Sequence, residues 1–338
     1  MNTSPQSTRG PLASLTGVRI QSVGACAPEL VVRNEDLAEQ GYDAEWIVRR
    51  TGIRQRRRAR QDQATSDIAY EAARDCLERA DVSPSAVDLI LLATMTPDSP
   101  MPATACLVQD RLGSRAPALD MNAACAGFMY ALTTGAQYVK TGCCKNVLVI
   151  GVDLMSRVVN PEDKKTFPLF GDGGGAVLLT AGEPEQGFLA YTLGADGGGG
   201  GVLHQPAGGT REPLSPEAWA SGRQYIQMEG RSVFKWAVRM VADSCQEVIR
   251  HAGVAAEELD LAIFHQANVR IIDAALEDLH LPKEKAVINL DRYGNTSAGS
   301  IPLALHEAVQ DQRVQPGSRL LLCGFGGGLA WGAAVWRW

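Results

Sequence analysis

The chain has 338 residues, of which 45% are hydrophobic and 21% are charged. This composition is typical of a globular protein with two domains, or with one large two-part unit. The net charge of −6 argues against nucleic acid as the main partner. Residues 320–336 carry no charge but are dense in glycine, so there we predict strand, loop and strand instead of a membrane span.

The N-terminal segment, residues 1–14, lacks the apolar core of a signal peptide, and we expect a short mobile tail. The eight cysteines include no CxxC pair, and no export signal precedes them. We therefore expect reduced thiols and a cytoplasmic location. No pair of Cys or His residues has the spacing of zinc ligands, so we expect no metal site.

The first unusual segment in chain order is "RRTGIRQRRRAR", residues 49–60, which has seven arginines and no acid. Two interpretations stay open for the run as a whole. It is either a solvated basic loop or a docking site for a polyanion, such as a phosphorylated cofactor or an acidic protein.

Helix-like and strand-like patterns then alternate along the chain. A helical pattern over residues 67–80 precedes a short apolar run over 87–94, and a second helical pattern over 127–142 precedes another such run over 146–153. Continuous apolar runs of this length predict central strands of a sheet that helices cover on both faces. The sequence thus predicts an α/β fold.

The same order of segments recurs later in the chain. "VDLILLAT" resembles "LDLAIFHQ", with Asp88 and Asp260 172 positions apart, and "CAGFMYAL" resembles "SAGSIPLAL", with Cys125 and Ser297 also 172 positions apart. "NVLVIG" resembles "RLLLCG" at an offset of 173. We therefore predict two duplicated α/β halves, residues 1–185 and residues 186–338.

Three chemically useful side chains follow the strands of these halves. Cys125 lies among small residues where a helix begins, His265 ends a predicted strand, and Asn295 lies in the second-half equivalent of the Cys125 loop. Each has a plainer explanation by itself: a small buried hydrophobe, a structural histidine and a turn residue. Because catalytic groups of α/β units gather at the carboxyl ends of strands, we expect the three to share one cavity.

Six motifs in order resemble the β-ketoacyl-[acyl carrier protein] synthase III enzymes of the thiolase superfamily, from about residue 16 to Trp338. They are "EWIVRRTGIRQR", "DMNAACAGF", "FGDGGGAVLL", "FHQANVRI", "YGNTSAGSIPLAL" and "GFGGGLAWGAAV". The resemblance implies a five-layered αβαβα fold, a homodimer and an acyltransferase that needs no cofactor. It implies Claisen condensation of an acyl-CoA primer with malonyl-acyl carrier protein, the step that initiates fatty acid synthesis.

The resemblance also assigns catalytic roles. Cys125 becomes the acyl-bearing nucleophile, and we expect the helix that begins there to lower the pKa of its thiol. The backbone N–H groups of Cys125 and Gly327 form the oxyanion hole. A neutral His265 and Asn295 bind the malonyl thioester oxygen and stabilise the enolate that decarboxylation leaves.

Further residues are assigned to substrate binding by the same resemblance. For CoA they are Trp46 and Arg157, which sandwich the adenine, Arg50 on a phosphate, and Arg270 at the tunnel mouth. For the acyl pocket they are Met101, which reaches into the partner chain's pocket, Phe234 and Trp236. Arg54, Arg56, Arg57 and Arg58 either help to hold an acidic carrier protein or only solubilise the chain.

The sequence departs from the family pattern at two positions and contains one unusual glycine run. The family commonly has Phe at the position of Met101, and Trp236 is larger than expected, so the sequence leaves the primer's length and branching undetermined. We expect the five-glycine run 197–201 to be a flexible loop. Two alternatives to fatty-acid initiation remain: a condensing enzyme or acyltransferase of secondary metabolism with a specialised primer or acceptor, and a non-catalytic paralogue that binds carrier protein, against which the complete Cys-His-Asn set argues.

Overall fold

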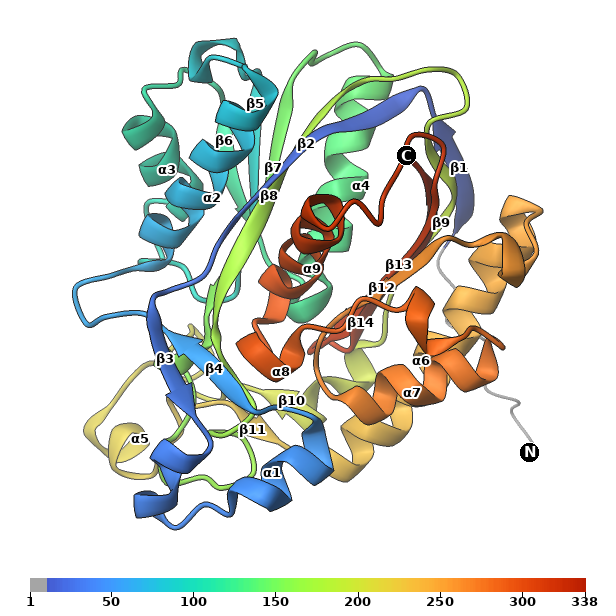
Figure 1. Cartoon of the computed structure of the whole chain (residues 1–338). Coiled ribbons are helices and arrows are strands. Elements are labelled where there is room, and N and C mark those ends of the chain that lie inside the picture. The colour runs from blue at the N-terminus through green and yellow to red at the C-terminus, as the bar shows by residue number, and fades with distance from the viewer. Residues whose placement is uncertain (1–10) are drawn as a thin grey trace, which may run out of the picture.

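Two five-stranded sheets form the frame of the fold (Figure 1). The structure is a computed structural model and describes residues 11–338, apart from the side chains of residues 39 and 40. The first sheet has the order β2 (Val18–Cys26), β8 (Asp172–Ala181), β7 (Val147–Leu154), β5 (Leu89–Ala93), β6 (Ala118–Met121). The second has the order β1 (Leu12–Thr16), β9 (Gly187–Ala195), β14 (Ala330–Arg337), β13 (Arg319–Gly326), β12 (Leu261–Phe264). Each sheet is mixed: β5 is parallel to both β6 and β7, β12 is parallel to β13, and the other neighbours are antiparallel.

Helices fill the space between the sheets and cover their outer faces, which gives five layers in the order αβαβα (Figure 1). The central layer is α4 (Gly127–Lys140) with α9 (Ser300–Gln310). The outer layers are α2 (Thr65–Ala80) with α3 (Thr104–Leu112) on the first sheet, and α6 (Gly230–Ala252) with α7 (Val269–Asp278) on the second. The predicted α/β class and five-layered arrangement are confirmed.

Smaller elements lie at one end of the layers. They are α1 (Ala44–Thr51), α5 (Pro216–Ala220), α8 (Leu290–Tyr293) and two short antiparallel strand pairs, β3 (Leu30–Arg33) with β4 (Gln55–Arg58) and β10 (Leu203–His204) with β11 (Gln227–Met228). Within residues 11–338, no helix is both long and apolar enough to cross a bilayer. All eight cysteines are free thiols.

The predicted periodicities match the elements that form. The run 87–94 contains β5, whose five residues are all buried, as expected for a strand with helices on both faces. The runs 67–80, 127–142 and 146–153 correspond to α2, α4 and β7, and the segment 320–336 forms β13, a turn and β14. The predicted tail, residues 1–14, lies outside the described residues up to position 10, whereas its last residues belong to β1.

The sheets also repeat one another. In the first sheet Leu89 of β5 pairs with Val147 of β7, and in the second sheet Leu261 of β12 pairs with Leu320 of β13. The counterparts are therefore 172 and 173 positions apart. We propose the division into residues 1–185 and 186–338 on this basis, with β1 crossing over to pair with β9 of the second sheet.

The turns that enter α4 and α9 correct one detail of the predicted repeat. Ala124 (φ 45°) and Ser297 (φ 50°) each hold a left-handed backbone conformation at the start of a 3-10 turn, η3 (Ala124–Ala126) and η8 (Ser297–Gly299). The two residues are counterparts, so the offset here is 173. The match of Cys125 with Ser297 was wrong by one position, because Cys125 corresponds to Ala298.

Side-chain hydrogen bonds support the corrected register. The Asn122 side chain accepts a hydrogen bond from the N–H of Ala124 (3.1 Å), and the Asn295 side chain accepts one from the N–H of Ser297 (2.9 Å). Asn122 and Asn295 are also 173 positions apart. By residue type Ser297 resembles Cys125, whereas by backbone conformation Ser297 matches Ala124.

The basic run 49–60 is neither a solvated loop nor a free docking site throughout. Arg56 on β4 is fully buried, and its guanidinium donates to the Asn34 side chain and to the Pro168 carbonyl, both at 2.7 Å. Burial lowers the pKa of Arg56 to about 10. This arginine therefore holds the β3–β4 strand pair against the loop before β8 and cannot contact a carrier protein.

The five-glycine run is also different from its prediction. Residues Gly197–Val202 form a 3-10 turn, and the Asp196 carboxylate accepts a hydrogen bond from the N–H of Gly198 (3.0 Å). Asp196 and Leu329 exchange two backbone hydrogen bonds, of 2.8 and 3.0 Å. A Cβ on Gly199 would lie 2.5 Å from the Leu329 side chain. The glycines thus allow close packing against the β13–β14 turn and do not form a flexible loop.

Candidate active site

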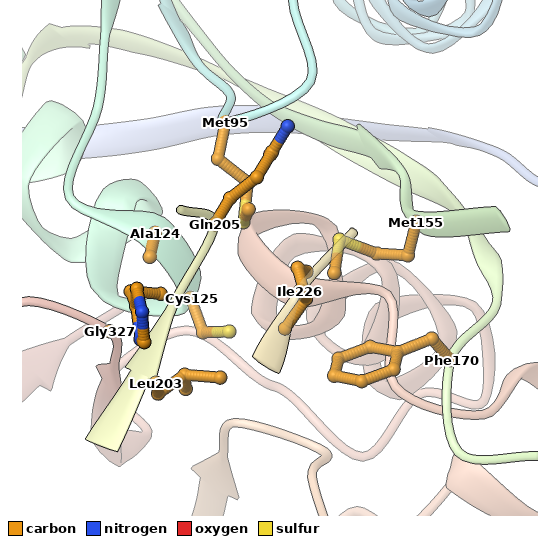
Figure 2. Close-up of a pocket in the computed structure, with 10 residues that line it drawn as sticks. Met95, Ala124, Cys125, Met155, Phe170, Leu203, Gln205, Ile226 and Gly327 are labelled. Atoms are coloured by element: carbon orange, nitrogen blue, oxygen red, sulfur yellow. The ribbon is translucent and has the colours of Figure 1, made fainter. Parts of the chain in front are cut away.

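Cys125 lies in the tight turn that leads into α4. Ala124 before it has the positive φ that non-glycine residues rarely adopt, and such residues often occur at functional sites. Cys125 itself is buried, at 6% exposure. Figure 2 shows its sulfur pointing into a cavity between Leu203, Ile226 and Phe170. The turn therefore presents the thiol to enclosed space and not to bulk solvent.

The turn between β13 and β14 approaches Cys125 closely. A Cβ on Gly326 would lie 2.8 Å from the Cβ of Cys125, 2.9 Å from its backbone nitrogen and 3.2 Å from its sulfur. Only glycine fits there, because real Cβ atoms do not approach other atoms so closely. Gly327, the predicted second oxyanion donor, lines the same cavity (Figure 2). The structure thus brings the two predicted oxyanion residues to one place.

The cavity beside the sulfur is small and mainly apolar, with a volume of about 60 Å³. Its wall combines residues from both halves, which come from loops after strands and from the β10–β11 pair. They are Met95, Ala124, Cys125, Met155, Phe170, Leu203, His204, Gln205, Ile226 and Gly327.

The pKa of the Cys125 thiol differs from the expectation. The pKa is raised to about 12: burial is the largest cause, the Ser297 hydroxyl acts against it, and the nearby charge of Asp153 acts with it. The Ser297 oxygen is itself buried without a hydrogen bond of regular geometry. The expected lowering by the helix is therefore outweighed by desolvation, and the free thiol is protonated at neutral pH.

His265 directly follows β12 and is buried, with 2% exposure. Its Nδ1 lies 2.7 Å from the Ser300 hydroxyl, which also accepts a hydrogen bond from the N–H of Gln266 (3.3 Å). We assign the hydroxyl proton to Nδ1, which leaves the imidazole proton on Nε2. Burial lowers the pKa of His265 to about 3, so the ring is neutral at working pH.

Asn295 is held from both sides in the loop before η8. Its N–H donates to the Leu169 carbonyl (2.9 Å), and its own carbonyl accepts from the N–H of Gly171 (3.0 Å). Because the side-chain oxygen is bonded to the N–H of Ser297, the amide NH₂ is the end that remains to donate. The amide is therefore oriented as a hydrogen-bond donor.

One short segment, residues 295–300, connects the three predicted catalytic residues. It contains Asn295, then Ser297 beside the Cys125 thiol, then Ser300 on His265. The His265 ring also packs edge-on against Phe325, with 5.1 Å between ring centroids, and Phe325 precedes the glycine that touches Cys125. The three residues are thus connected at the junction of the two halves, but of the three only Cys125 lines the cavity described above, so that cavity is not shared as expected.

The residues predicted to bind CoA lie along a route on the surface. Trp46 on α1 is 40% exposed, and the Arg50 guanidinium lies 6.0 Å from the centre of its ring. The Arg50 carbonyl accepts a hydrogen bond from the side chain of Asn268 (3.1 Å), which caps α7. Arg270 in the first turn of α7 lies over the Phe234 ring at 5.2 Å. These contacts connect the nucleotide candidates to the candidate at the tunnel mouth.

Arg157 stands apart from this group. It is exposed on η4 (Met155–Arg157) and donates to the carbonyls of Arg60 (2.6 Å) and Gln63 (3.2 Å). These bonds connect it to the loop after β4 and not to Trp46.

The residues predicted for the acyl pocket do not line the cavity at Cys125 within one chain. Met101 is 85% exposed on the surface. Phe234 lies under Arg270, and Trp236 packs edge-on against Trp331, with 6.4 Å between ring centroids. The actual wall residues include Met155, Phe170, Leu203 and Ile226.

Comparisons with known proteins agree with this geometry. Models of 3-oxoacyl-[acyl-carrier-protein] synthase III match residues 119–197 and, for its C-terminal part, residues 249–338. A β-ketoacyl-[acyl-carrier-protein] synthase III from Rhodopirellula baltica is 55% identical over 97% of this chain and 100% of its own length. The chain belongs to the β-ketoacyl-[acyl-carrier-protein] synthase III family.

Solved structures give the same family and fold. The synthase III from Aquifex aeolicus superposes with a TM-score of 0.88 at 44% identity, and covers 95% of this chain and 100% of its own. A priming β-ketosynthase from a polyketide biosynthetic pathway superposes with a TM-score of 0.89 at 32% identity, and covers 96% and 97%. The fold is thus the thiolase-like one that the motifs implied.

Sequence reasoning missed several residues of this synthase III site. Met155 directly follows β7 and could have been found from its position after a strand, whereas Phe170 opens the motif "FGDGGGAVLL" just before β8 and could have been found only from that motif. Ser297 and Ser300 lie inside a quoted motif, but nothing in the letters shows which group each touches. Leu203 and Ile226 come from a segment without periodicity, which gave no signal.

Proposed function

We propose that this synthase III chain transfers an acyl group from acyl-CoA to Cys125 and then condenses it with malonyl-acyl carrier protein, with loss of carbon dioxide. The observation that carries the proposal is the junction of residues 295–300 with the Cys125 turn. There the Cys125 thiol and Gly327 line an apolar cavity, and the adjoining segment carries Asn295 and bonds the neutral His265 through Ser300.

The first half-reaction forms the acyl-enzyme. The Cys125 sulfur gives up its proton, attacks the thioester carbon of acyl-CoA and expels CoA as the thiol. The N–H groups of Cys125 and Gly327 stabilise the oxyanion, and preorganised donors of this kind contribute about 3–4 kcal/mol each. Because the thiol pKa is high, proton removal accompanies acyl transfer and does not precede it.

The second half-reaction uses the side-chain donors. The His265 Nε2–H and the Asn295 amide hydrogen-bond the malonyl thioester oxygen, so that the electrons left by departing carbon dioxide collect there as an enolate. The enolate carbon attacks the Cys125 thioester, which releases the β-ketoacyl product on its carrier and returns the thiolate. A neutral imidazole fits this role, because donation and not proton abstraction is needed. No metal or other cofactor enters either half-reaction.

The substrate route follows the surface residues. Trp46 and Arg50 bind the nucleotide of CoA, and Arg270 meets the pantetheine arm or the acidic carrier protein at the mouth. Arg157, which the family resemblance assigns to the other side of the adenine, would reach it from its place against the loop after β4. The mainly apolar wall and small volume of the cavity favour a short acyl primer. A cytoplasmic location follows from these substrates.

A second copy of the chain completes the enzyme in this proposal. β6 is the outermost strand of its sheet, and apolar side chains are exposed beside it, with Met101 at 85%, Leu119 at 42% and Leu107 at 38%. An open strand edge with apolar neighbours is a surface that proteins normally cover. In a homodimer, Met101 would reach the partner's acyl pocket, as the family resemblance implies.

A second candidate function keeps the chemistry and changes the pathway. The priming β-ketosynthase of a polyketide pathway superposes on this chain as well as synthase III enzymes do. The chain would then load a specialised primer onto a dedicated carrier protein.

The test follows both half-reactions with one protein. The enzyme is incubated with a panel of acyl-CoAs, and the mass added to Cys125 is read by peptide mass spectrometry. Malonyl-acyl carrier protein is then added, and carbon dioxide and β-ketoacyl product are measured. Acylation by short acyl-CoA followed by condensation supports fatty-acid initiation. Preference for an unusual acyl group or carrier supports the second candidate, and failure to acylate any thiol refutes both.

A further inference from the structure

A buried carboxylate lies beneath the catalytic junction, where neither half-reaction uses it. Asp153, near the end of β7, is fully buried. Its Oδ1 accepts hydrogen bonds from the N–H groups of Met95 (2.8 Å) and Thr96 (3.1 Å). It also accepts from the hydroxyls of Thr94 (2.8 Å) and Thr96 (3.0 Å). Its Oδ2 accepts from the N–H of Ala298 (3.1 Å).

These bonds join segments that are far apart in sequence. Residues 94–96 follow β5 and include Met95, which lines the cavity. Ala298 lies in η8, three residues after Asn295. Burial of a charged group is unfavourable unless hydrogen bonds replace its lost hydration, and here five donors from the two halves do so. The carboxylate therefore connects the cavity wall to the turn that presents Asn295.

The contact between Asp153 and Ala298 can be compared with the equivalent place in the other half of the repeat. Ala298 is the counterpart of Cys125, and at the same offset of 173 Asp153 is the counterpart of Gly326. In one half, the glycine of β13 brings no side chain to the N–H of Cys125. In the other half, the aspartate of β7 places a carboxylate oxygen on the N–H of Ala298. The turn at Ala298 is thus always occupied by the Asp153 side chain of the same protein.

We propose that Asp153 is a positioning residue that fixes the turn carrying Asn295 in register with the Cys125 cavity. The proposal rests on the proposed function, since Asn295 is taken to act on the malonyl thioester. An amide is a poor replacement for the carboxylate, because the five groups that bond its oxygens all donate. With its oxygen toward residues 94–96, an asparagine would direct its NH₂ against the N–H of Ala298.

The carboxylate also has an electrostatic signature at the nucleophile. Asp153 carries the charge that acts on the Cys125 thiol in the described structure. Burial raises the pKa of Asp153 itself and its hydrogen bonds lower it, so the readout below is made at alkaline pH, where the carboxylate is ionised. Repulsion of a negatively charged reagent from Cys125 therefore reports on Asp153. Loosening of the turn alone would not change the preference between a neutral and a charged reagent of similar size.

The test compares Asp153→Asn with Asp172→Asn as a matched control. Asp172 is also a fully buried carboxylate, but it accepts from Ala59 and Ser156 and makes no bond to the turns at Cys125. Acylation by acyl-CoA and condensation with malonyl-acyl carrier protein are measured separately. In Asp153→Asn, we expect the ratio of condensation to acylation to fall by about tenfold or more, which is the loss of a charged hydrogen bond. In Asp172→Asn, the ratio stays at the wild-type value.

Alkylation of Cys125 gives the second readout. Rates with neutral iodoacetamide and anionic iodoacetate are compared by peptide mass spectrometry. Removal of the Asp153 charge should raise the iodoacetate rate, relative to the iodoacetamide rate, by about threefold or more. The control should leave this relative rate unchanged.

A folded Asp153→Asn enzyme with both ratios at wild-type values would overturn the inference. Should that variant not fold, Thr94→Val decides, because it removes one hydroxyl donor and keeps the carboxylate. We expect it to lower the condensation-to-acylation ratio by a smaller factor, about two- to fivefold, and an unchanged ratio would also overturn the inference. A wild-type enzyme that acylates but never condenses would instead refute the proposed function.

Discussion

Removal of the Ser300 hydroxyl should separate the two half-reactions. Ser300→Ala leaves the backbone of α9 and its buried position unchanged, but it deletes the group 2.7 Å from His265 Nδ1. His265 then loses the contact that keeps its proton on Nε2, the atom that we propose donates to the malonyl oxygen. Condensation should fall, whereas acylation of Cys125, which depends on backbone N–H groups, should stay near the wild-type rate.

The magnitude follows from the burial of both partners. Ser300 is 1% exposed and His265 is 2% exposed, so water cannot replace the lost contact. A buried polar atom left without its partner costs about 1–3 kcal/mol. If the enolate-forming step bears that cost, condensation slows roughly 5- to 150-fold at 1.4 kcal/mol per factor of ten.

The assay measures acyl transfer to Cys125 and carbon dioxide release from malonyl-acyl carrier protein in separate single-turnover experiments. Ser244→Ala is the matched control, because Ser244 is also buried on a helix and its hydroxyl bonds the local carbonyls of Met240 (2.7 Å) and Val241 (3.3 Å), with the Cys323 sulfur 3.9 Å away. The control should show any general effect of a lost buried hydroxyl. Equal slowing of both half-reactions in Ser300→Ala would refute the reasoning and would make His265 the base that deprotonates Cys125.

Four further results are expected. Cys125→Ser should abolish acylation while the protein stays folded, since a serine hydroxyl is a far weaker nucleophile and leaving group; turnover at a tenth of wild type would contradict the assignment. Gly326→Ala should lower acylation by about 100-fold or more, because its Cβ would displace the Cys125 turn from the oxyanion donors, and a normal acylation burst would exclude this packing. Arg50→Ala should raise KM for acyl-CoA with little change in kcat, and a large fall in kcat alone would contradict its placement. For His265, whose folded pKa of about 3 lies below the unfolded value, the unfolded state binds more protons between these pH values. Its stabilising contribution is therefore complete above about pH 6.5 and is lost as pH falls toward 3, which denaturant titrations of wild type and His265→Gln should show as a smaller pH dependence in the variant.

Much of the fold was predictable because its signals are local or repeated. The fully buried run of β5 and the helical period of α4 each indicate one element, and the repeat places the two halves beside one another. The register of the Cys125 turn was not predictable from letters, because Ser297 resembles a nucleophile in type. The backbone conformation of Ala124 decides the match, and positive φ at an alanine leaves no trace in sequence.

The site was predictable to a similar extent. The motifs identified Cys125, His265 and Asn295 as candidates, but burial, which depends on the whole assembly of layers, reversed the expected direction of the Cys125 pKa shift. Arg56 shows the same limit on the surface: composition suggested a solvated or docking role for its run, yet three-dimensional packing encloses it. The charged residues of a sequence can be counted, but the sequence alone does not show which of them are buried.

The pairing of β1 with β9 has a consequence for the order in which the protein folds during synthesis. All strands of the first sheet lie within residues 18–181, so that sheet can pair before the second half leaves the ribosome. β1, although it comes first, must wait for residue 187 to emerge before it finds β9. α4 covers the inner face of the first sheet mainly over β5 and β7, whereas the part over β2 and β8 stays largely uncovered until α9, residues 300–310, has been made. For most of translation, the nascent chain therefore exposes one unpaired strand and part of one apolar sheet face, the surfaces that a chaperone recognises.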